Sequence, residues 1–348
     1  MCRKRALHAQ GRLRAGTVDS WLLWNLTGGT AHATDSSNAA RTQLLNLDTG
    51  QWDTDLTDWF GVPLEILPQV RASDSLFGVT CGSISGLPAG IPVHAIMGDS
   101  HAALFGHDID APGRIKVTLG TGSSLMCPTE SRKSSANGMS ETIAWNRGGA
   151  ITYALEGNIA VSGHAAAFVS QMLGLPNTDT LTRLAETVPD SDGVTVLPAL
   201  AGLGAPHWGA AARGLIAGLS LATRPAHIAR ATLEGIAHQI CDVLEAIETD
   251  LGVPVDVIHA DGGATRNALL VQQIADICDR PVQCAAVAEL SAFGAARLAA
   301  SSLGLSVPAP KTGLRVCPAM HPARRTQLRS VWQLSILQSL LRPAPTNA

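Results

Sequence analysis

The sequence predicts an α/β protein built of two domains. Its 348 residues, of which 46% are hydrophobic and 15% charged, can bury at least one large core, and the length favours two domains. Residues 255–278 have the pattern of a strand, a tight turn with two glycines and a helix, which is the unit of α/β nucleotide-binding domains. The turn-forming segment 108–113 is the best boundary, which predicts domains of residues 1–110 and 111–348.

The first domain is expected to begin with short helices. A helix is predicted over 17–28, where two glycines end it, and another over 52–60. Segment 34–41 predicts either the capped start of a further helix or an ordered polar loop. The hydrophobic run 91–97 predicts a buried strand, and 99–106 predicts a helix that packs its apolar residues inward.

The second domain is expected to alternate strands and helices. Its longest helix is predicted over 225–250, because a proline lies near its start and apolar residues recur at helical spacing. A strand over 115–119 leads into a loop of Gly, Thr and Ser. Further strands are expected at 150–157, 195–200 and 255–260, and further helices at 162–173, 266–278, 291–303 and 322–341.

Composition excludes several classes of function. The formal net charge is -3 and no basic block stands out, so nucleic acid is not an expected partner. No uninterrupted apolar run reaches about 18 residues, so no membrane span is expected, and the basic first residues lack the apolar core of a secretory signal. Seven scattered cysteines without a CxxC pair are typical of reduced thiols. A cytoplasmic location is therefore predicted.

Two polar segments that follow predicted strands carry the strongest signal for chemistry. Segment 98–102 places Asp99 after a hydrophobic run, where a carboxylate faces a crevice in open α/β sheets, although Asp99 could instead cap the next helix. Segment 120–124 can offer backbone N–H groups and hydroxyls to an anion, or form a plain hairpin turn. A base near a phosphate cradle is the minimum equipment for phosphoryl transfer from a nucleotide to a hydroxyl group.

Other candidate motifs are weaker. Segment 120–124 matches neither a P-loop nor a dinucleotide-binding fingerprint. The histidines form no close metal-binding pattern, and His101 is expected to be a supporting or surface residue rather than a base. The turn 261–264 leaves room for a flat ring or a phosphate, or is an ordinary strand-to-helix turn. Trp208 could stack on a sugar, or pack on the surface.

The order of these segments is specific, and the chain resembles the FGGY carbohydrate kinase family, most of all its glycerol kinase branch. The similarity runs from about residue 10 to about residue 335. This resemblance implies an actin-like ATPase (ribonuclease H-like) fold, in which two related α/β domains hold ATP and substrate in the cleft between them. The segments that carry it are 16–29, 34–42, 98–106, 202–208, 212–219, 227–234 and 261–267.

The resemblance also implies roles for individual residues. Asp99 would be the general base on the substrate hydroxyl, and Ser100 and Ser124 would line the substrate site beside it. Mg²⁺ would be held with ATP, so that Asp99 meets it only indirectly. The residues expected at the ATP site are Gly120 and Thr121 at the phosphates, with Gly163, Gly263, Ala264 and Asn267 along the nucleotide.

Several positions depart from the family pattern. The opening hairpin with its Asp-Gly-Thr phosphate loop is absent, as is the upstream Arg-Glu pair that grips a polyol. The resemblance therefore implies an incomplete first domain within residues 1–110 and a complete ATP-binding domain, with a helical tail, within 111–348. Ser100 and Ser124 stand where glycerol kinases carry Gln and Phe, and Ala167 stands where a Gln would meet ATP. A longer polyol or a ketose fits these polar replacements as well as glycerol does.

Three functions follow from these expectations. The favoured one is an ATP-dependent kinase of a small polyol or sugar. The second is a chain that is catalytically silent alone, or one part of a split kinase that another N-terminal segment or a homo-oligomer completes. The third is an actin-like ATPase without a small-molecule acceptor, which ATP hydrolysis unaffected by any polyol would favour. Uncovered sheet edges and apolar surface in the first domain predict that the chain alone self-associates.

Overall fold

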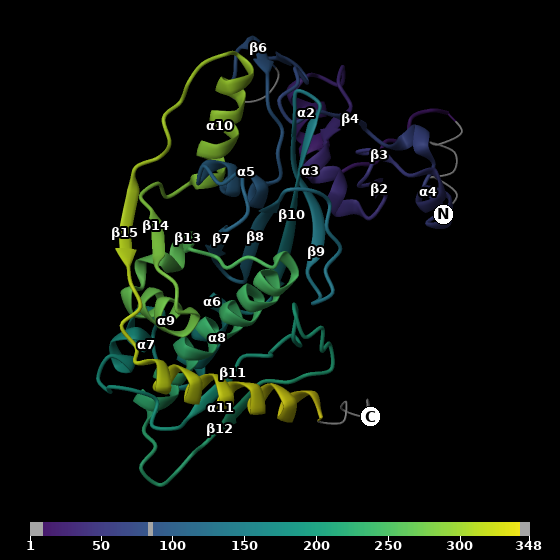
Figure 1. Cartoon of the computed structure of the whole chain (residues 1–348). Coiled ribbons are helices and arrows are strands. Elements are labelled where there is room, and N and C mark those ends of the chain that lie inside the picture. Colours follow the sequence, from purple (N-terminus) through teal and green to yellow (C-terminus); the bar gives the residue numbers. More distant parts are fainter. Residues whose placement is uncertain (1–9, 83–85, 342–348) are drawn as a thin grey trace.

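A seven-stranded mixed sheet forms the centre of the structure, a computed structural model that describes residues 10–82 and 86–341 (Figure 1). Its strands, in spatial order, are β15 (Thr312–Val316), β14 (Val282–Ala285), β13 (Val257–Asp261), β7 (Arg114–Leu119), β8 (Ser123–Thr129), β10 (Ala150–Ile159) and β9 (Ser140–Arg147). β13 pairs in parallel with β7 and β14, and the other pairs of this sheet are antiparallel. The parallel strands β7 and β13 therefore both end at the edge where ligands bind in α/β folds.

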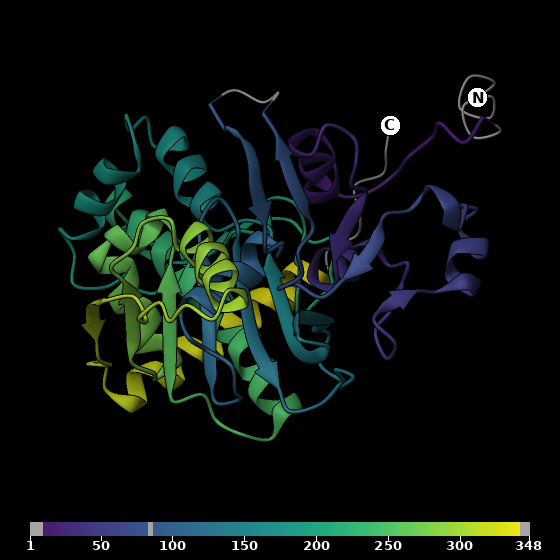
Figure 2. The ribbon, with the colours of Figure 1, turned by 90° about the horizontal axis from the view of Figure 1, so that it is seen from above.

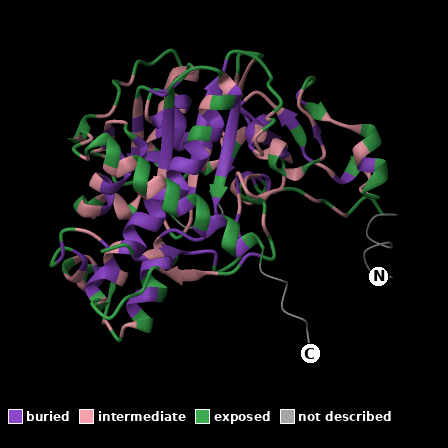
Figure 3. Cartoon of the chain, turned by 60° about the horizontal axis from the view of Figure 1, so that its bottom comes forward, coloured by how far each residue is buried: buried purple, intermediate pink, exposed green. Residues whose placement is uncertain are grey.

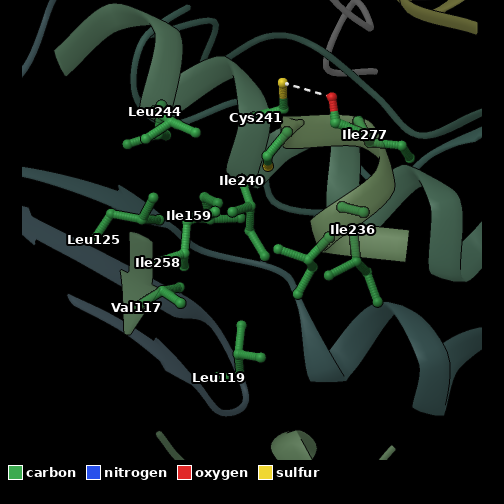
Figure 4. Packing of buried hydrophobic residues seen from close by; sticks show 14 of the residues in the cluster. Val117, Leu119, Leu125, Ile159, Ile236, Ile240, Cys241, Leu244, Ile258 and Ile277 are labelled. Atoms are coloured by element: carbon green, nitrogen blue, oxygen red, sulfur yellow. Dashed lines mark hydrogen bonds between the residues drawn. The ribbon is translucent and has the colours of Figure 1, made fainter. Parts of the chain in front are cut away.

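Helices cover both faces of this sheet. The helices α6 (Gly163–Met172), α8 (Pro225–Leu251) and α9 (Ala268–Cys278) contribute to one core, in which Ile236 and Ile240 of α8 pack on Val117 and Leu125 (Figure 4). The helices α5 (Asp99–Gly106) and α10 (Leu290–Ser302) share the other core with Met126. Because side chains alternate across a strand, Leu125 and Met126 of β8 join opposite cores.

Two local features place α5 and α8. Helix α8 begins with Pro225 in its first turn and ends at Gly252, whose φ of 70° is the left-handed cap that favours glycine. Helices α5 and α10 pack backbone to backbone, because a Cβ added to Gly294 would lie 1.9 Å from the carbonyl oxygen of Ala102. This close contact fixes the helix whose first residue is Asp99.

The first part of the chain folds into small elements beside the β9 edge of the sheet (Figure 2). There β1 (Ala33–Asp35) pairs in parallel with β4 (Gln69–Arg71), and α3 (Ser36–Ala39) packs on β9. The remaining elements of this part are α2 (Val18–Leu26), η1 (Ala40–Thr42), β2 (Leu45–Asn46), β3 (Gln51–Trp52), α4 (Thr54–Trp59), η2 (Leu64–Ile66), β5 (Gly78–Cys81) and β6 (Ala89–Val93).

A third packing unit lies at the far end of the molecule from α10. Here α11 (Pro322–Leu340) lies against the short strands β11 (Thr195–Leu197) and β12 (Leu215–Ala217) (Figure 1), and Trp332 is buried in the core that they share. Figure 3 colours the chain by burial. The remaining helical segments are α7 (Thr178–Ala185) and η3 (Gly263–Arg266). Within residues 10–82 and 86–341, no helix combines the length and the apolar character that a bilayer span requires.

The α/β fold class and most of the predicted helices are confirmed. The helices expected at 17–28, 52–60, 99–106 and 225–250 appear as α2, α4, α5 and α8. Segment 34–41 does start a helix, because the Asp35 side chain accepts hydrogen bonds from the first backbone N–H groups of α3. The division into domains at residues 110 and 111 stays a prediction.

The strands were predicted less well than the helices. The run 91–97 is not a buried strand: β6 ends at Val93, and all but its last residue are exposed, because it pairs only with β5 in a two-stranded ribbon. No strand was predicted at β1, β2, β3, β4, β5, β8, β9, β12, β14 or β15, and no helix at α7.

Candidate functional site

The turn Gly120–Gly122 between β7 and β8 separates two cavities. One, of about 880 Å³, is lined by Thr118, Gly122 and Ser124 among others and is called here the Asp99 cavity. The other, of about 660 Å³, reaches the opposite side of the turn and is called here the Asn267 cavity. The predicted site residues divide between them: Asp99, Ser100 and Ser124 line the first, and Gly120, Thr121, Gly163, Gly263, Ala264 and Asn267 line the second.

Asp99 is placed by the start of α5. It is the first residue of the helix, it is exposed, and its Oδ1 accepts a hydrogen bond of 2.6 Å from the backbone N–H of Ser100. The hydroxyl of Ser37 accepts from the N–H of Gly98 at 2.9 Å, which ties the start of α5 to α3. The N-cap of α5 is Gly98, so the alternative prediction that Asp99 caps this helix is wrong. Asp99 lies in the first turn, where a carboxylate is favourable, and it lines the cavity.

A chain of polar contacts crosses the floor of the Asp99 cavity. The ammonium of Lys116 donates to the Ser100 hydroxyl at 2.7 Å, and the hydroxyls of Ser100 and Ser124 lie 3.0 Å apart. Ser124 in turn donates to Glu156 Oε1 at 3.1 Å, and Arg41 Nη1 lies 2.6 Å from Glu156 Oε2. Five residues from β7, α5, β8, β10 and η1 thus form one connected network.

The sequence analysis missed three members of this network. Lys116 is fully buried, and burial lowers the pKa of its ammonium while Asp261, Glu156 and Asp99 oppose that shift. A lysine in the middle of an apolar strand is rare without a partner, and this was the available signal. Glu156 and Arg41 gave no comparable signal, because their pairing depends on how η1 meets β10.

Two further side chains line the Asp99 cavity. The Thr118 hydroxyl is buried and has no hydrogen-bond partner among the described residues, so the fold leaves its hydrogen unused. His101 is buried, which agrees with the expected supporting role and not with the surface alternative, and burial lowers the pKa of its imidazole to about 3. Its Nε2 lies 3.3 Å from the Thr142 hydroxyl. An imidazole with so low a pKa is a poor base near neutral pH, which leaves the carboxylates.

Backbone forms much of the Asn267 cavity. The N–H of Gly163 donates to the Gly120 carbonyl at 3.0 Å, and a Cβ on Gly163 would lie 2.5 Å from that oxygen, so α6 starts in direct contact with the turn. A Cβ on Gly263 would meet only the Arg266 side chain, at 3.6 Å. The Gly263 backbone is therefore open to a ligand, whereas Gly163 is required by the packing of the chain on itself.

Asn267 has a structural role in addition to its place in the cavity. Its Oδ1 accepts from the Leu270 N–H at 3.0 Å as the cap of α9, and its Nδ2 donates to the Thr182 hydroxyl at 2.8 Å. The side chain therefore joins α9 to α7 across the cavity.

The two cavities share a structural support. His107, which caps the end of α5, lies with Nε2 2.9 Å from Asp261 Oδ2, and both side chains are buried. Asp261 ends β13 and directly precedes the Gly262-Gly263 turn of the Asn267 cavity. Helix α5 thus connects the Asp99 cavity at its start to the Asn267 cavity at its end.

The arrangement suits transfer between two ligands. A carboxylate can take a proton from a hydroxyl group held in the Asp99 cavity, while the backbone of two glycine turns faces the other cavity, where phosphates can approach. Within residues 10–82 and 86–341, no group of three or more His, Cys, Asp or Glu side chains could hold a metal ion.

Comparison with known proteins identifies the family. Residues 115–303 match the C-terminal domain, and residues 4–106 the N-terminal domain, of the FGGY family of carbohydrate kinases. The chain is 50% identical to an apulose kinase of Pectobacterium atrosepticum over 296 residues, which cover 85% of this chain and 60% of that protein. It is 44% identical to a glycerol kinase of Alkalilimnicola ehrlichii over 331 residues, which cover 94% of this chain and 66% of that protein. The chain thus spans about three fifths to two thirds of the length of these relatives.

Solved structures agree with this assignment. A glycerol kinase of Plasmodium falciparum with ADP superposes with a TM-score of 0.89 at 28% identity, over 97% of this chain and 69% of that one. A xylulose kinase from Rhodospirillum rubrum gives a TM-score of 0.78 at 26% identity, over 92% of this chain and 66% of that one. The expected actin-like ATPase fold is confirmed, and the chain belongs to the FGGY family of carbohydrate kinases.

Proposed function

We propose that the protein transfers a phosphoryl group from ATP to a hydroxyl of a small polyol or sugar, with Asp99 as the general base. The observation that carries this proposal is the Gly120–Gly122 turn, which has the Asp99 cavity on one side and the Asn267 cavity on the other. Two ligands that meet at this turn would be close enough to react directly. The relatives that share this sequence are named as kinases of apulose and of glycerol, which are polyhydroxy compounds.

The nucleotide is assigned to the Asn267 cavity. Gly120 and Thr121 would face its phosphates, and Gly163, Gly263, Ala264 and Asn267 would line the rest. Bound Mg²⁺ would neutralise charge on the phosphates, and Asp99 would contact it only indirectly. Ser100 and Ser124 would contact the acceptor beside Asp99.

The proposed reaction requires the protein to position the two ligands and to accept one proton. Asp99 would orient the acceptor hydroxyl and take its proton as the oxygen–phosphorus bond forms and the bond between the γ-phosphorus and the bridging oxygen breaks. The acceptor and the terminal phosphate would be held in line by the two cavities, and exclusion of water from them would protect the phosphoryl group from hydrolysis.

The variant Asp99→Asn tests this proposal. We expect wild-type protein to release ADP from ATP in the presence of one or more of glycerol, xylitol, D-xylulose and D-ribulose. Loss of a general base should lower that rate by about 10²- to 10⁴-fold. Asp110→Asn, an exposed carboxylate outside both cavities, is the matched control and should keep the wild-type rate. Near-normal turnover of Asp99→Asn would reject Asp99 as the base.

The same assay separates the alternatives. The chain spans only part of the length of its relatives, so a chain that is silent alone, or one part of a split kinase, is the second candidate. ATP binding without acceptor-dependent ADP release would support it. ATP hydrolysis that no polyol or sugar changes would favour an ATPase without a small-molecule acceptor. A cytoplasmic location and a homo-oligomer stay predictions.

A further inference from the structure

The network on the floor of the Asp99 cavity has a fixed direction. Lys116 donates to Ser100, and in its charged form it has only hydrogen-bond donors. Burial lowers the pKa of this ammonium, while the carboxylates of Asp261, Glu156 and Asp99 oppose that shift. At the other end, the Glu156 carboxylate has only acceptors, and Arg41 lies 2.6 Å from it. Two serine hydroxyls, each with a single hydrogen, lie between these ends.

This arrangement determines where each hydroxyl hydrogen points. The Lys116 ammonium donates to Ser100 at 2.7 Å, so Ser100 must use its own hydrogen elsewhere. Ser124 donates to Glu156 at 3.1 Å, so its oxygen can only accept from Ser100 across the 3.0 Å contact. Both hydrogens are therefore used inside the network. Reversing them would break hydrogen bonds to charged groups, which are stronger than hydrogen bonds between neutral groups.

We propose that Lys116 and Glu156 make Ser100 and Ser124 hydrogen-bond acceptors toward the Asp99 cavity, so that the cavity selects a compound that donates a hydroxyl group to them. This inference rests on the proposed function, because it takes the Asp99 cavity to be the acceptor site. A neutral polyol or sugar satisfies both serines. A carbonyl or carboxylate oxygen at the same position would face acceptors only, and a buried acceptor without a donor is costly.

Thr118 differs from the two serines in how its hydroxyl hydrogen is used. The Thr118 hydroxyl lines the same cavity and has no partner among the described residues, so its hydrogen remains available. Arg41 also lines the cavity and has only donors, so a ligand that needs a donor from the protein would find one there and none at the two serines.

Fluorinated substrates test the direction of these bonds. Fluorine is close to a hydroxyl in size, yet it cannot donate a hydrogen bond. Calorimetry with the full chain would compare glycerol and D-xylulose with their monofluoro and monodeoxy forms, substituted at each carbon in turn. At a carbon other than the one whose hydroxyl faces Asp99, we expect the fluoro form to bind at least about 10-fold more weakly than the parent compound.

Two variants assign that penalty to the network. Glu156→Gln places an amide, which can donate a hydrogen bond, beside Ser124. The Ser124 hydrogen can then turn to the cavity. The loss of affinity caused by fluorine, called here the fluoro penalty, should therefore fall below about threefold. Glu130→Gln, an exposed carboxylate after β8, is the matched control and should keep the full penalty. If Glu156→Gln does not fold, the double variant Ser100→Ala/Ser124→Ala carries the test, because it should bind fluoro and parent forms within about threefold.

The outcomes separate this inference from the function on which it rests. If a parent compound binds but its fluoro forms bind equally well at every carbon, the direction of the network is wrong while the acceptor site stands. A penalty that survives in the double serine variant would also overturn the inference. If neither parent compound binds, both the acceptor site and the inference fail.

Discussion

His101 and His238 are held where a charged imidazole is costly. Burial lowers the pKa of each to about 3, with Arg41 and Lys116 near His101 and Arg329 near His238 adding to the shift. Both folded values lie below the unfolded value of about 6.5. The unfolded chain therefore binds protons first as the pH falls, and stability is lost from about pH 6.5 downward to about pH 3.

His238 gives a test of this linkage away from the candidate site. Its ring stacks on Trp332 at 5.0 Å, and the variant His238→Gln removes the titrating group. Between pH 7 and pH 5, the free energy of unfolding of the wild type should fall by on the order of 2 kcal/mol more than that of His238→Gln. Urea unfolding at both pH values measures the difference.

The control for this experiment is an exposed histidine. His321 lies at the start of α11, and His321→Gln should lose stability with falling pH to the same extent as the wild type. Equal pH dependence of the wild type and His238→Gln would show that the buried imidazole is not the cause. Burial raises the pKa values of Asp35 and Glu234, so these two carboxyls increase the free energy of unfolding as the pH falls. Their contribution is the same in the wild type and in both variants, and it cancels when the proteins are compared.

At the candidate site, the sequence predicted individual polar residues better than their connections. Asp99 stood out because it follows an apolar run, whereas the family resemblance implied Ser100 and Ser124, and the structure brings all three to one cavity. Their link to Lys116 and Glu156 depends on strand register, which sets Thr118 opposite Ser124 and Ser124 opposite Asn158. Register depends on how two strands pair, so it cannot be predicted from the sequence of either strand alone.

Among the elements, the turn after β13 shows how two adjacent glycines differ in purpose. Gly262 has a φ of 94°, and a Cβ there would lie 2.4 Å from the Leu119 carbonyl oxygen, so the fold itself requires glycine. Gly263 lines the Asn267 cavity and has neither constraint, because its added Cβ would lie 3.6 Å from the nearest side chain, Arg266. Gly262 is therefore required for stability, whereas Gly263 is expected to matter for ligand binding.

Alanine at each of these glycines should have opposite effects. We expect Gly263→Ala to unfold at the wild-type temperature but to bind ATP and ADP about 10-fold more weakly, since a methyl group occupies space meant for the nucleotide. Gly262→Ala should instead lose about 2 kcal/mol or more of stability. Thermal unfolding and calorimetry measure both. Unchanged nucleotide affinity in Gly263→Ala would move the nucleotide away from this turn.

The elements themselves were predictable to the extent that local pattern determines them. Helices such as α8 have a proline at the start, a glycine at the end and an apolar face, and all three signals lie within the helix. The strand β6 was predicted to be buried because its sequence is apolar, but an apolar run does not show which elements will cover it. In the structure only β5 pairs with β6, which leaves most of the strand exposed. The strands β14 and β15 are too short for a periodic signal, and the sheet around them defines them.

At the scale of the whole molecule, the candidate catalytic groups share one rigid frame. Helix α5 begins at Asp99, packs closely on α10 at Gly294, and is tied at its end by His107 to Asp261. The paired strands β7 and β13 lead directly into the two glycine turns beside the Asn267 cavity, Gly120–Gly122 and Gly262-Gly263. The carboxylate and the glycine turns should therefore keep their relative positions, as a reaction that depends mainly on positioning requires.

The surface of the first part of the chain carries an uncovered apolar stripe. Val18, Trp21 and Leu22 on α2 are 73%, 64% and 49% exposed, and their spacing of three and four residues places them on one face of the helix. Contiguous exposed apolar surface favours association. We therefore expect the chain to self-associate at high concentration, and Trp21→Ser to shift it toward the monomer because it removes the largest side chain of the stripe.

Light scattering across a concentration series measures this effect. Val253→Ser is the matched control, since Val253 is 40% exposed but lies beyond the end of α8, far from the stripe in sequence, and should leave the association unchanged. Circular dichroism should show that both variants keep the wild-type helix content, because neither side chain belongs to a core. A wild-type chain that stays monomeric at high concentration would show that the exposed face of α2 does not drive association. Equal loss of association in both variants would place the contact elsewhere on the surface.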